Sequence, residues 1–163
     1  MRARSTTVDS YCVRNVVTAT RETPVARCAQ LMHDEHVGGL VIVDERGGQS
    51  IPVGMITDRD IAIEVVAFGV DAQTLTAGDI MAGELAVARD DEDLLSVLAT
   101  MREHGVRRLP VVGADGSLMG IVTADNLWEV LAEEVDGLAR VVRAGQTRER
   151  KTRIAGALQA APG

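Results

Sequence analysis

Two stretches of seven residues share one pattern and constrain the fold more than any other feature of this 163-residue chain. Each begins with a glycine, continues through a short apolar strand to a threonine, and ends with a side chain that can start a helix. The stretches are Gly54–Asp60 and Gly120–Asn126. Since internal repeats are sought before single elements are assigned, the pattern predicts one supersecondary unit used twice. The functional site is then expected where the two copies meet.

The repetition extends well beyond these stretches. A shift of 69 residues places Met32 on Met101. After a loop that is three residues longer in the first copy, a shift of 66 residues places Gly54 on Gly120. Each copy reads as strand, helix, strand, strand and helix. Because a unit of roughly 60 residues buries only a marginal core, we expect the two copies to pack against each other.

Composition and charge exclude several classes of function. The chain is 46% apolar but only 2% aromatic, and its net charge is −7. These values disfavour a nucleic-acid interface, which relies on a basic face or on stacking aromatic side chains. No apolar run approaches the ~20 residues of a membrane span, and Cys12 and Cys28 form no disulfide framework. We expect a cytoplasmic protein that does not contact membranes.

We divide the chain into five segments. They are a flexible N-terminus (1–10), a first repeat (11–68), a linker (69–78), a second repeat (79–142) and an Arg-rich C-terminal tail (143–163). The last helix is expected to start near Ala124 or Asp125 and to end at about Val142, and the tail to be partly helical or disordered. The tail is either a solvated helix end or a contact with nucleic acid, an acidic surface or a partner subunit.

Several motifs together resemble one family. The first predicted helix carries P-V-x-x-x-A-x-x-M from Pro24 to Met32, both copies close with G-h-h-T-x-x-D/N, and Arg107–Val112 reads R-R-L-P-V-V. These motifs resemble the cystathionine-β-synthase (CBS) domain over about Tyr11 to Glu134. The resemblance implies a tandem pair, or Bateman module, of the stand-alone bacterial type. Its fold would be α/β (α+β), with two βαββα repeats packed pseudo-symmetrically through their sheets.

The family resemblance also implies a function. Such pairs leave two clefts between the repeats, and many members bind an adenosine ligand there, such as AMP, ADP, ATP or S-adenosylmethionine; NADH is a further candidate. Many form homodimers, and the ligand usually regulates a partner protein. We therefore expect a regulatory nucleotide sensor that acts on an unidentified protein. The alternatives are a dimerisation module without a ligand and, less favoured, nucleic-acid binding through the basic tail.

The residue types suit this chemistry without reference to the family. An aspartate at a helix start can accept hydrogen bonds from ribose hydroxyls, and threonine hydroxyls can bond to a ribose or phosphate. Helix N-termini favour phosphate, and guanidinium groups bind it in a bidentate manner.

Carried over by position, the family pattern gives two composite clefts. The first cleft joins Val17, Thr18, Val37 and Gly38 to Thr123, Asp125 and Asn126. The second cleft joins Ala86, Val87, Val106 and Arg107 to Thr57, Arg59 and Asp60. Arg107 and Arg108 match positions that often reach the phosphates.

The chain departs from the family pattern at two places. Asn126 replaces the more usual aspartate, and Gly38–Gly39 occupy the positions that Arg107–Arg108 occupy in the second copy. We therefore expect the cleft with Asp60 to be the better equipped.

Structural roles compete with each functional assignment. Thr57 and Asp60 could serve only as a helix N-cap, and the two arginines could lie in solvent or pair with carboxylates. His33, His36 and His104 do not form an enclosed set of metal ligands, and no nucleophile or paired-carboxylate arrangement is evident. We expect neither a metal site nor an enzyme.

Overall fold

The structure is a computed structural model that describes residues 7–81 and 83–159, with side chains given as far as residue 149. The described residues fall into two compact units, which meet in sequence between Ala124 and Asp125. The first unit contains both repeats and is described first. The second unit is one long helix.

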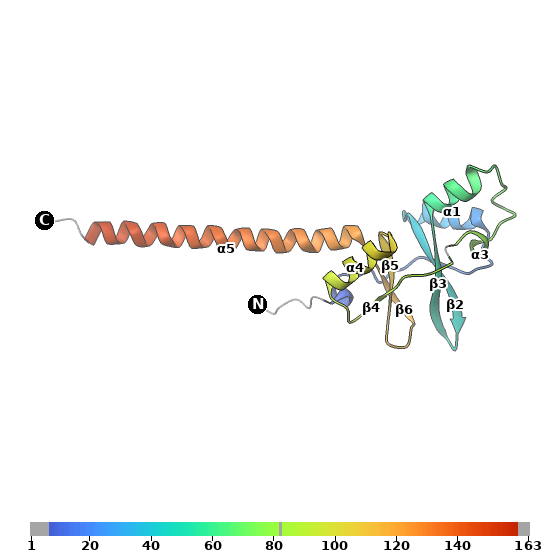
Figure 1. Ribbon diagram of the computed structural model, residues 1–163, viewed down its shortest axis with the longest axis horizontal. Helices are drawn as coiled ribbons and strands as arrows, with labels where there is room; N and C mark the ends of the chain where they lie inside the picture. The colour runs from blue at the N-terminus through green and yellow to red at the C-terminus, as the bar shows by residue number, and fades with distance from the viewer. Residues whose placement is uncertain (1–6, 82, 160–163) are drawn as a thin grey trace. The chain divides into compact units, whose positions relative to one another are not determined.

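The two repeats have the same element order (Figure 1). After a short 3₁₀ turn, η1 (Val8–Ser10), the first repeat contains β1 (Thr18–Ala19), α1 (Val25–Asp34), β2 (Gly39–Arg46), β3 (Gln49–Thr57) and α2 (Asp58–Ile61), which continues as a π-helical turn, η2 (Ala62–Val66). The second repeat contains α3 (Ala77–Ile80), β4 (Ala88–Arg89), α4 (Leu94–His104), β5 (Arg108–Val112) and β6 (Leu118–Thr123), and α5 (Ala124–Gln159) follows.

Each repeat forms its own three-stranded sheet. The strand orders are β1-β2-β3 and β4-β5-β6, with a parallel first pair and an antiparallel hairpin in both sheets. Ala19 pairs with Ile42 in the first sheet, and Ala88 pairs with Val111 in the second. The two pairs are related by the shift of 69 residues, so the predicted α/β fold with two βαββα repeats is confirmed.

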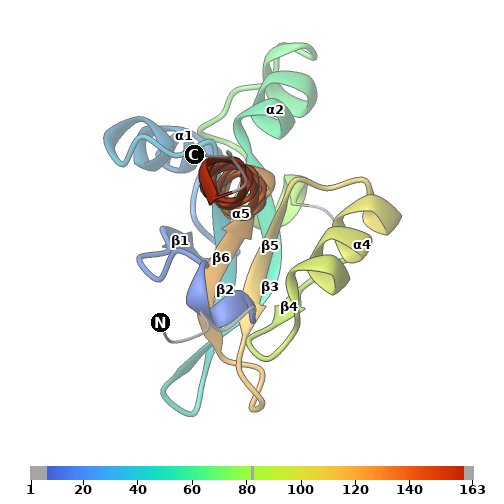
Figure 2. The same cartoon turned by 90° about the vertical axis from the view of Figure 1, so that its left-hand side faces the viewer.

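The hairpins follow from local sequence. Residues 40–43 and 109–112 are buried apolar runs, as expected for strands covered on both faces. Gly47 and Gly48 have φ values of 60° and 83°, which a two-residue hairpin turn of type I′ requires. The two hairpin turns lie at the same edge of the unit (Figures 1 and 2), where Gln49 Nε2 donates to Asp115 Oδ2 at 2.6 Å.

The segment that leads into each repeat pairs with the other repeat. The Thr76 segment forms a bridge with Pro24 at the start of α1, and the Thr7 segment forms the equivalent bridge with Asp93 before α4. The flanking backbone bonds repeat in the same way. Ala77 N donates to Thr23 O at 2.8 Å, and the equivalent Val8 N donates to Glu92 O at 2.8 Å. This reciprocal exchange joins the two repeats into one body.

Two equivalent glycines allow a segment of the other repeat to pass close to strands β3 and β6. A Cβ at Gly54 of β3 would lie 2.5 Å from Met81 Sδ, and a Cβ at Gly120 of β6 would lie 2.8 Å from Cys12 Sγ and 2.9 Å from Val13 O. Val13 and Ile121 also exchange backbone hydrogen bonds at 2.8 and 2.9 Å. Packing between the repeats therefore favours glycine at the start of both closing stretches, most strictly at Gly120, where the neighbour is a backbone oxygen.

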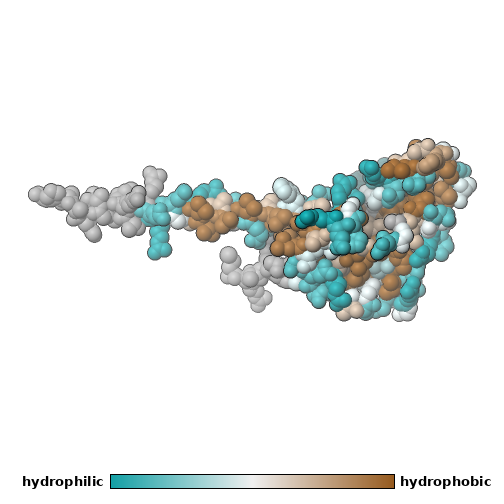
Figure 3. Space-filling view, in the orientation of Figure 1, coloured by the Kyte–Doolittle hydropathy of each residue, from teal (hydrophilic) through white to brown (hydrophobic). Residues whose placement is uncertain are grey.

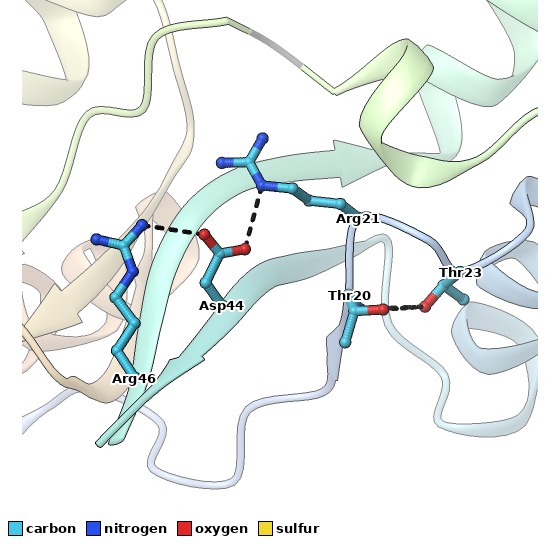
Figure 4. Close-up of polar contacts among 5 residues, drawn as sticks. All are labelled: Thr20, Arg21, Thr23, Asp44 and Arg46. Atoms are coloured by element: carbon cyan, nitrogen blue, oxygen red, sulfur yellow. Dashed lines mark hydrogen bonds and ion pairs between the residues drawn. The ribbon is translucent and has the colours of Figure 1, made fainter. Parts of the chain in front are cut away.

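An ion-pair cluster ties the β1–α1 loop to β2 (Figure 4). Arg21 Nε and Arg46 Nη2 donate to opposite oxygens of Asp44, at 3.1 and 3.0 Å. The hydrogen bond from Arg46, followed by that from Arg21, holds the pKa of Asp44 below its usual range. Thr20 and Thr23 share a hydroxyl hydrogen bond of 3.3 Å beside this cluster. Arg46 is exposed and Arg21 and Asp44 are only half-buried, so we assign the cluster a minor role in stability.

Two expectations about the chain ends need correction. Residues 1–10 were expected to be flexible, but Val8–Ser10 form η1 and Val8 is completely buried; residues 1–6 lie outside the described residues. The last helix was expected to end at about Val142, but α5 continues to Gln159. No proline interrupts residues 124–159, and Asp136 pairs with Arg140 at 2.6 Å within the helix, an arrangement that supports an exposed helix.

Candidate functional site

A cavity of about 230 Å³ lies between the two repeats of the first unit. Its walls are mostly apolar, and both copies contribute to them. The lining residues are Val13, Asn15, Val16, Val17, Val37, Gly38, Gly39, Arg108, Ile121 and Thr123. Apolar walls with a few polar groups are typical of small-molecule sites. The volume is slightly below the roughly 300–1,000 Å³ of drug-sized pockets and suits the base or nucleoside part of a ligand.

Arg108 is the charged group in this cavity. Its strand neighbour in the β5–β6 hairpin is Thr123, and this pairing brings both residues to the cavity. The Nη2 atom of Arg108 lies 2.8 Å from the position that a Cβ of Gly38 would occupy. The absence of a side chain at Gly38 therefore gives the guanidinium its room. Asp58 is also close, with its Oδ2 3.4 Å from the same position.

Within the part of the chain that the structure describes, Arg108 has no hydrogen bond or ion pair through its side chain. The residue is half-buried, so its charge is partly desolvated beside an apolar wall. Charge-assisted hydrogen bonds to an anion are strong in such a setting. Arg108 can therefore bind a phosphate or carboxylate that enters the cavity.

The structure brings together part of the first predicted cleft. Val17, Val37, Gly38 and Thr123 line the cavity, whereas the exposed Thr18 is not among the lining residues. Asp125 and Asn126 lie in the first turn of α5, in the second unit. Their role in ligand binding stays a prediction.

Two residues of the second predicted cleft have a clear structural role. Thr57 and Asp60 form a capping box at the start of α2. Asp60 Oδ2 accepts from Thr57 N at 2.8 Å and from Thr57 Oγ1 at 2.7 Å, and Thr57 Oγ1 accepts from Asp60 N at 3.2 Å. Thr57 and Asp60 therefore do cap the helix, as the competing structural interpretation proposed. A ligand role for these two residues stays a prediction.

The remaining residues of that cleft differ in exposure. Arg59, Val106 and Arg107 are exposed, and Ala86 and Val87 are half-buried just before β4. Arg107 contributes its carbonyl oxygen to Ala124 N at 2.9 Å.

The structure places Arg108 in a different cleft from the one that the sequence favoured. We expected the cleft with Asp60 to be the better equipped because the two arginines are in the second copy, but Arg108 lines the cavity that contains Gly38 and Thr123. The reason is steric, since the glycines in the first copy make room for a side chain from the second copy.

Sequence reasoning missed five lining residues. They are Val13, Asn15, Val16, Gly39 and Ile121. Ile121 belongs to the repeated closing stretch and Gly39 to the Gly-Gly pair, so the sequence held a signal for both. Val13 and Asn15 precede the first strand and carried none.

The potential metal ligands are not clustered. Cys28 is completely buried in the core of the first sheet, where burial raises the pKa of its thiol, and His33 and His36 are exposed. The described residues contain no group of three or more His, Cys, Asp or Glu side chains that could hold a metal ion. Among them there is also no helix with the length and apolar character needed to cross a membrane.

Comparison with known proteins decides the family. The model of the CBS domain matches residues 8–67 and 77–131, which together are most of the chain. The chain belongs to the CBS domain family. The two matches begin at Val8 and Ala77, which are the equivalent buried residues of the reciprocal exchange. The tandem pair of CBS repeats that the motifs indicated is thereby confirmed.

Relatives of this CBS pair have been found in archaea and bacteria. An uncharacterised protein of Methanopyrus kandleri is 33% identical over 127 residues, 78% of this chain, and the match spans 63% of that protein's length. Hypoxic response protein 1 of Mycobacterium tuberculosis is 36% identical over 105 residues, 64% of this chain and 71% of that protein.

Solved structures of CBS proteins are also similar. The CBS domain pair of protein MJ0100, in complex with 5′-methylthioadenosine and S-adenosyl-L-methionine, has a TM-score of 0.69 and 26% identity, covering 78% of this chain and 97% of that one. A hexameric CBS-CP12 protein from bloom-forming cyanobacteria has a TM-score of 0.67 and 25% identity, covering 86% of this chain and 83% of that one.

Proposed function

We propose that this CBS pair is a regulatory module that binds an adenosine ligand in the cavity around Gly38 and Arg108 and signals to a partner protein. The observation that carries the proposal is a guanidinium without a described partner in a mostly apolar cavity formed by both repeats. The similar CBS pair that binds two adenosine compounds supports the ligand class.

The cavity residues suggest a division of roles. Val16, Val17 and Ile121 would contact the faces of a purine, while the space beside Gly38 holds the guanidinium of Arg108. Arg108 would bind a phosphate or, in S-adenosylmethionine, the carboxylate. Candidate ligands are AMP, ADP, ATP, S-adenosylmethionine and NADH.

Signalling follows from the position of the cavity. A ligand that contacts both repeats can favour one packing of the repeats over another, and it shifts that equilibrium by its difference in affinity for the two states. The regulated protein would read this packing. We also propose that the module acts as a homodimer and has no catalytic activity of its own.

A binding assay with charge-neutralising variants tests the proposal. Calorimetric titration with each candidate ligand gives its affinity and stoichiometry for the native chain, Arg108→Gln and Arg107→Gln. We expect Arg108→Gln to weaken a phosphate-bearing ligand about 10- to 100-fold, as loss of a charge-assisted bond implies. Arg102→Gln is the matched control, because Arg102 is an exposed arginine of α4 that lines no predicted cleft.

Each outcome has a distinct meaning. Loss of binding in Arg107→Gln alone would assign the ligand to the cleft of Thr57 and Asp60, and a stoichiometry of two would assign ligands to both clefts. If no candidate ligand binds to the native chain, the module would be a ligand-free interaction domain.

A further inference from the structure

The helix α5 exposes a long apolar stripe. Trp128 is 73% exposed, Val135 67%, Leu138 65% and Val142 53%. Figure 3 shows apolar side chains gathered along α5, and shallow hollows on this helix are lined by the same residues together with Leu131, Ala132 and Ala139. Exposed apolar patches of this kind mark interaction surfaces.

The spacing of the stripe identifies the kind of partner that fits it. The large apolar residues alternate in steps of three and four positions, at Trp128, Leu131, Val135, Leu138 and Val142. An apolar stripe with a period of 3.5 residues is the pattern of a coiled-coil seam. Alanines 132 and 139 border the seam and permit close approach. The expected partner is therefore another helix with a matching seam.

The charges of α5 are divided between its two halves. Between residues 125 and 136 there are only acidic charges, at Asp125, Glu129, Glu133, Glu134 and Asp136. Between residues 140 and 153 the basic charges outnumber one glutamate, at Arg140, Arg143, Arg148, Arg150, Lys151 and Arg153. Two copies side by side in the same direction would bring like charges together. Two copies in opposite directions would bring the acidic half of one against the basic half of the other.

We propose that α5 pairs with α5 of a second copy as an antiparallel two-stranded coiled coil. In this arrangement, with the seams centred near Gly137, Trp128 of one chain faces the small Gly145 of the other. Leu131 faces Val142, and Val135 faces Leu138. The acidic residues between 125 and 136 of one helix then lie alongside the segment of the other helix that carries Arg140, Arg143 and Arg148. The pairing does not depend on a ligand in the CBS cavity.

Mass measurement tests whether the stripe is the contact. The double variant Val135→Glu/Leu138→Glu places two charges in the seam. We expect its mass, measured by light scattering after size exclusion, to be half that of the native assembly, whether that assembly is a dimer or a larger multiple. The control, Ala144→Glu/Thr147→Glu, adds the same charges to exposed positions away from the seam and is expected to keep the native mass. A monomeric native chain, or an unchanged mass in the seam variant, would overturn the proposal.

Spin-label distances test the orientation. One chain carries a label at Glu129→Cys and the other at Thr147→Cys, both on the outer face of the helix, in a Cys12→Ser background that retains the buried Cys28. In an antiparallel pair the 129–147 distance between chains is shorter than the 147–147 distance. In a parallel pair this order is reversed, since 18 residues of helix rise by about 27 Å. The reversed order would overturn the antiparallel arrangement.

Discussion

The two repeats have the same backbone plan but differ where they face each other. Both use a glycine at the crossing point, a bulged hairpin and a leading segment that pairs with the other repeat. At the equivalent positions where the second strand begins, however, the first repeat has Gly38–Gly39 and the second has Arg107–Arg108. Repetition therefore maintains the fold, while one pair of residues makes the two clefts chemically unequal.

The largest effect is expected at the two crossing glycines. A side chain at Gly120 meets the backbone oxygen of Val13, which cannot move without breaking the Val13–Ile121 pairing, whereas a side chain at Gly54 meets the flexible end of Met81. We expect Gly120→Ala to lower the free energy of unfolding by about 2–3 kcal/mol and Gly54→Ala by about 1 kcal/mol. Urea denaturation measures both. Equal losses would mean that the two crossings are equally adaptable.

A methyl group at Gly38 should affect the ligand more than the fold. The new Cβ would displace the guanidinium of Arg108, which is the end of a flexible side chain. We expect Gly38→Ala to weaken binding of a phosphate-bearing ligand about tenfold, or about 1.4 kcal/mol, with little change in thermal stability. Calorimetry and a thermal melt separate the two effects. Unchanged affinity would remove Arg108 from the site.

The first helices of the two repeats differ in their caps. Asp93 Oδ1 accepts from Ser96 N at 2.8 Å at the start of α4, while Pro24 at the start of α1 has no side-chain cap. The bond from Ser96 lowers the pKa of Asp93. The stabilisation is therefore present above the unfolded pKa of about 3.9 and is lost as pH falls through the lower folded value.

We expect Asp93→Ala to lower the melting temperature at pH 7, and the difference from the native chain to shrink in acid below about pH 4. Asp93→Asn should retain the cap at pH 7, and Pro24→Ala should leave capping unaffected. A pH-independent loss in Asp93→Ala would show that packing, rather than the charged cap, is responsible.

The smallest effect is expected at Tyr11, whose equivalent in the second repeat is the apolar Ile80. The Tyr11 hydroxyl is buried with no hydrogen-bond partner among the described residues. Burial, with the charge of Asp93 second, raises the pKa of Tyr11 to about 12. The neutral form is therefore favoured by folding, and stability is lost as pH rises from the unfolded pKa of about 10 towards 12.

We expect Tyr11→Phe to be neutral or to stabilise the fold by up to about 1 kcal/mol at pH 7. It should also reduce the alkaline loss of stability above about pH 10. Denaturation at pH 7 and pH 11 provides the comparison. Destabilisation by more than 1 kcal/mol would indicate that the hydroxyl has a partner.

More of the fold than of the candidate site could be predicted from the sequence. The repeated glycine, apolar strand and threonine identified both hairpins, because local pairing and burial depend on residue type at short range. The start of α5 at Ala124 was also predicted. Its end was not, because Gly145 and the polar residues after Val142 are the usual signs of a helix end, whereas the ion pairs along the helix do not appear as a pattern of apolar residues.

The amino-acid sequence by itself determined the two-fold repeat, the βαββα order and the family, since these depend on spacing along the chain. Only the tertiary structure decided which cleft receives Arg108. That outcome depends on how the second repeat lies against the first, where the missing side chain of Gly38 leaves space for a guanidinium from a residue 70 positions away. The reciprocal pairing of the leading segments is likewise tertiary, because backbone hydrogen bonds between distant segments have no signature in side-chain types.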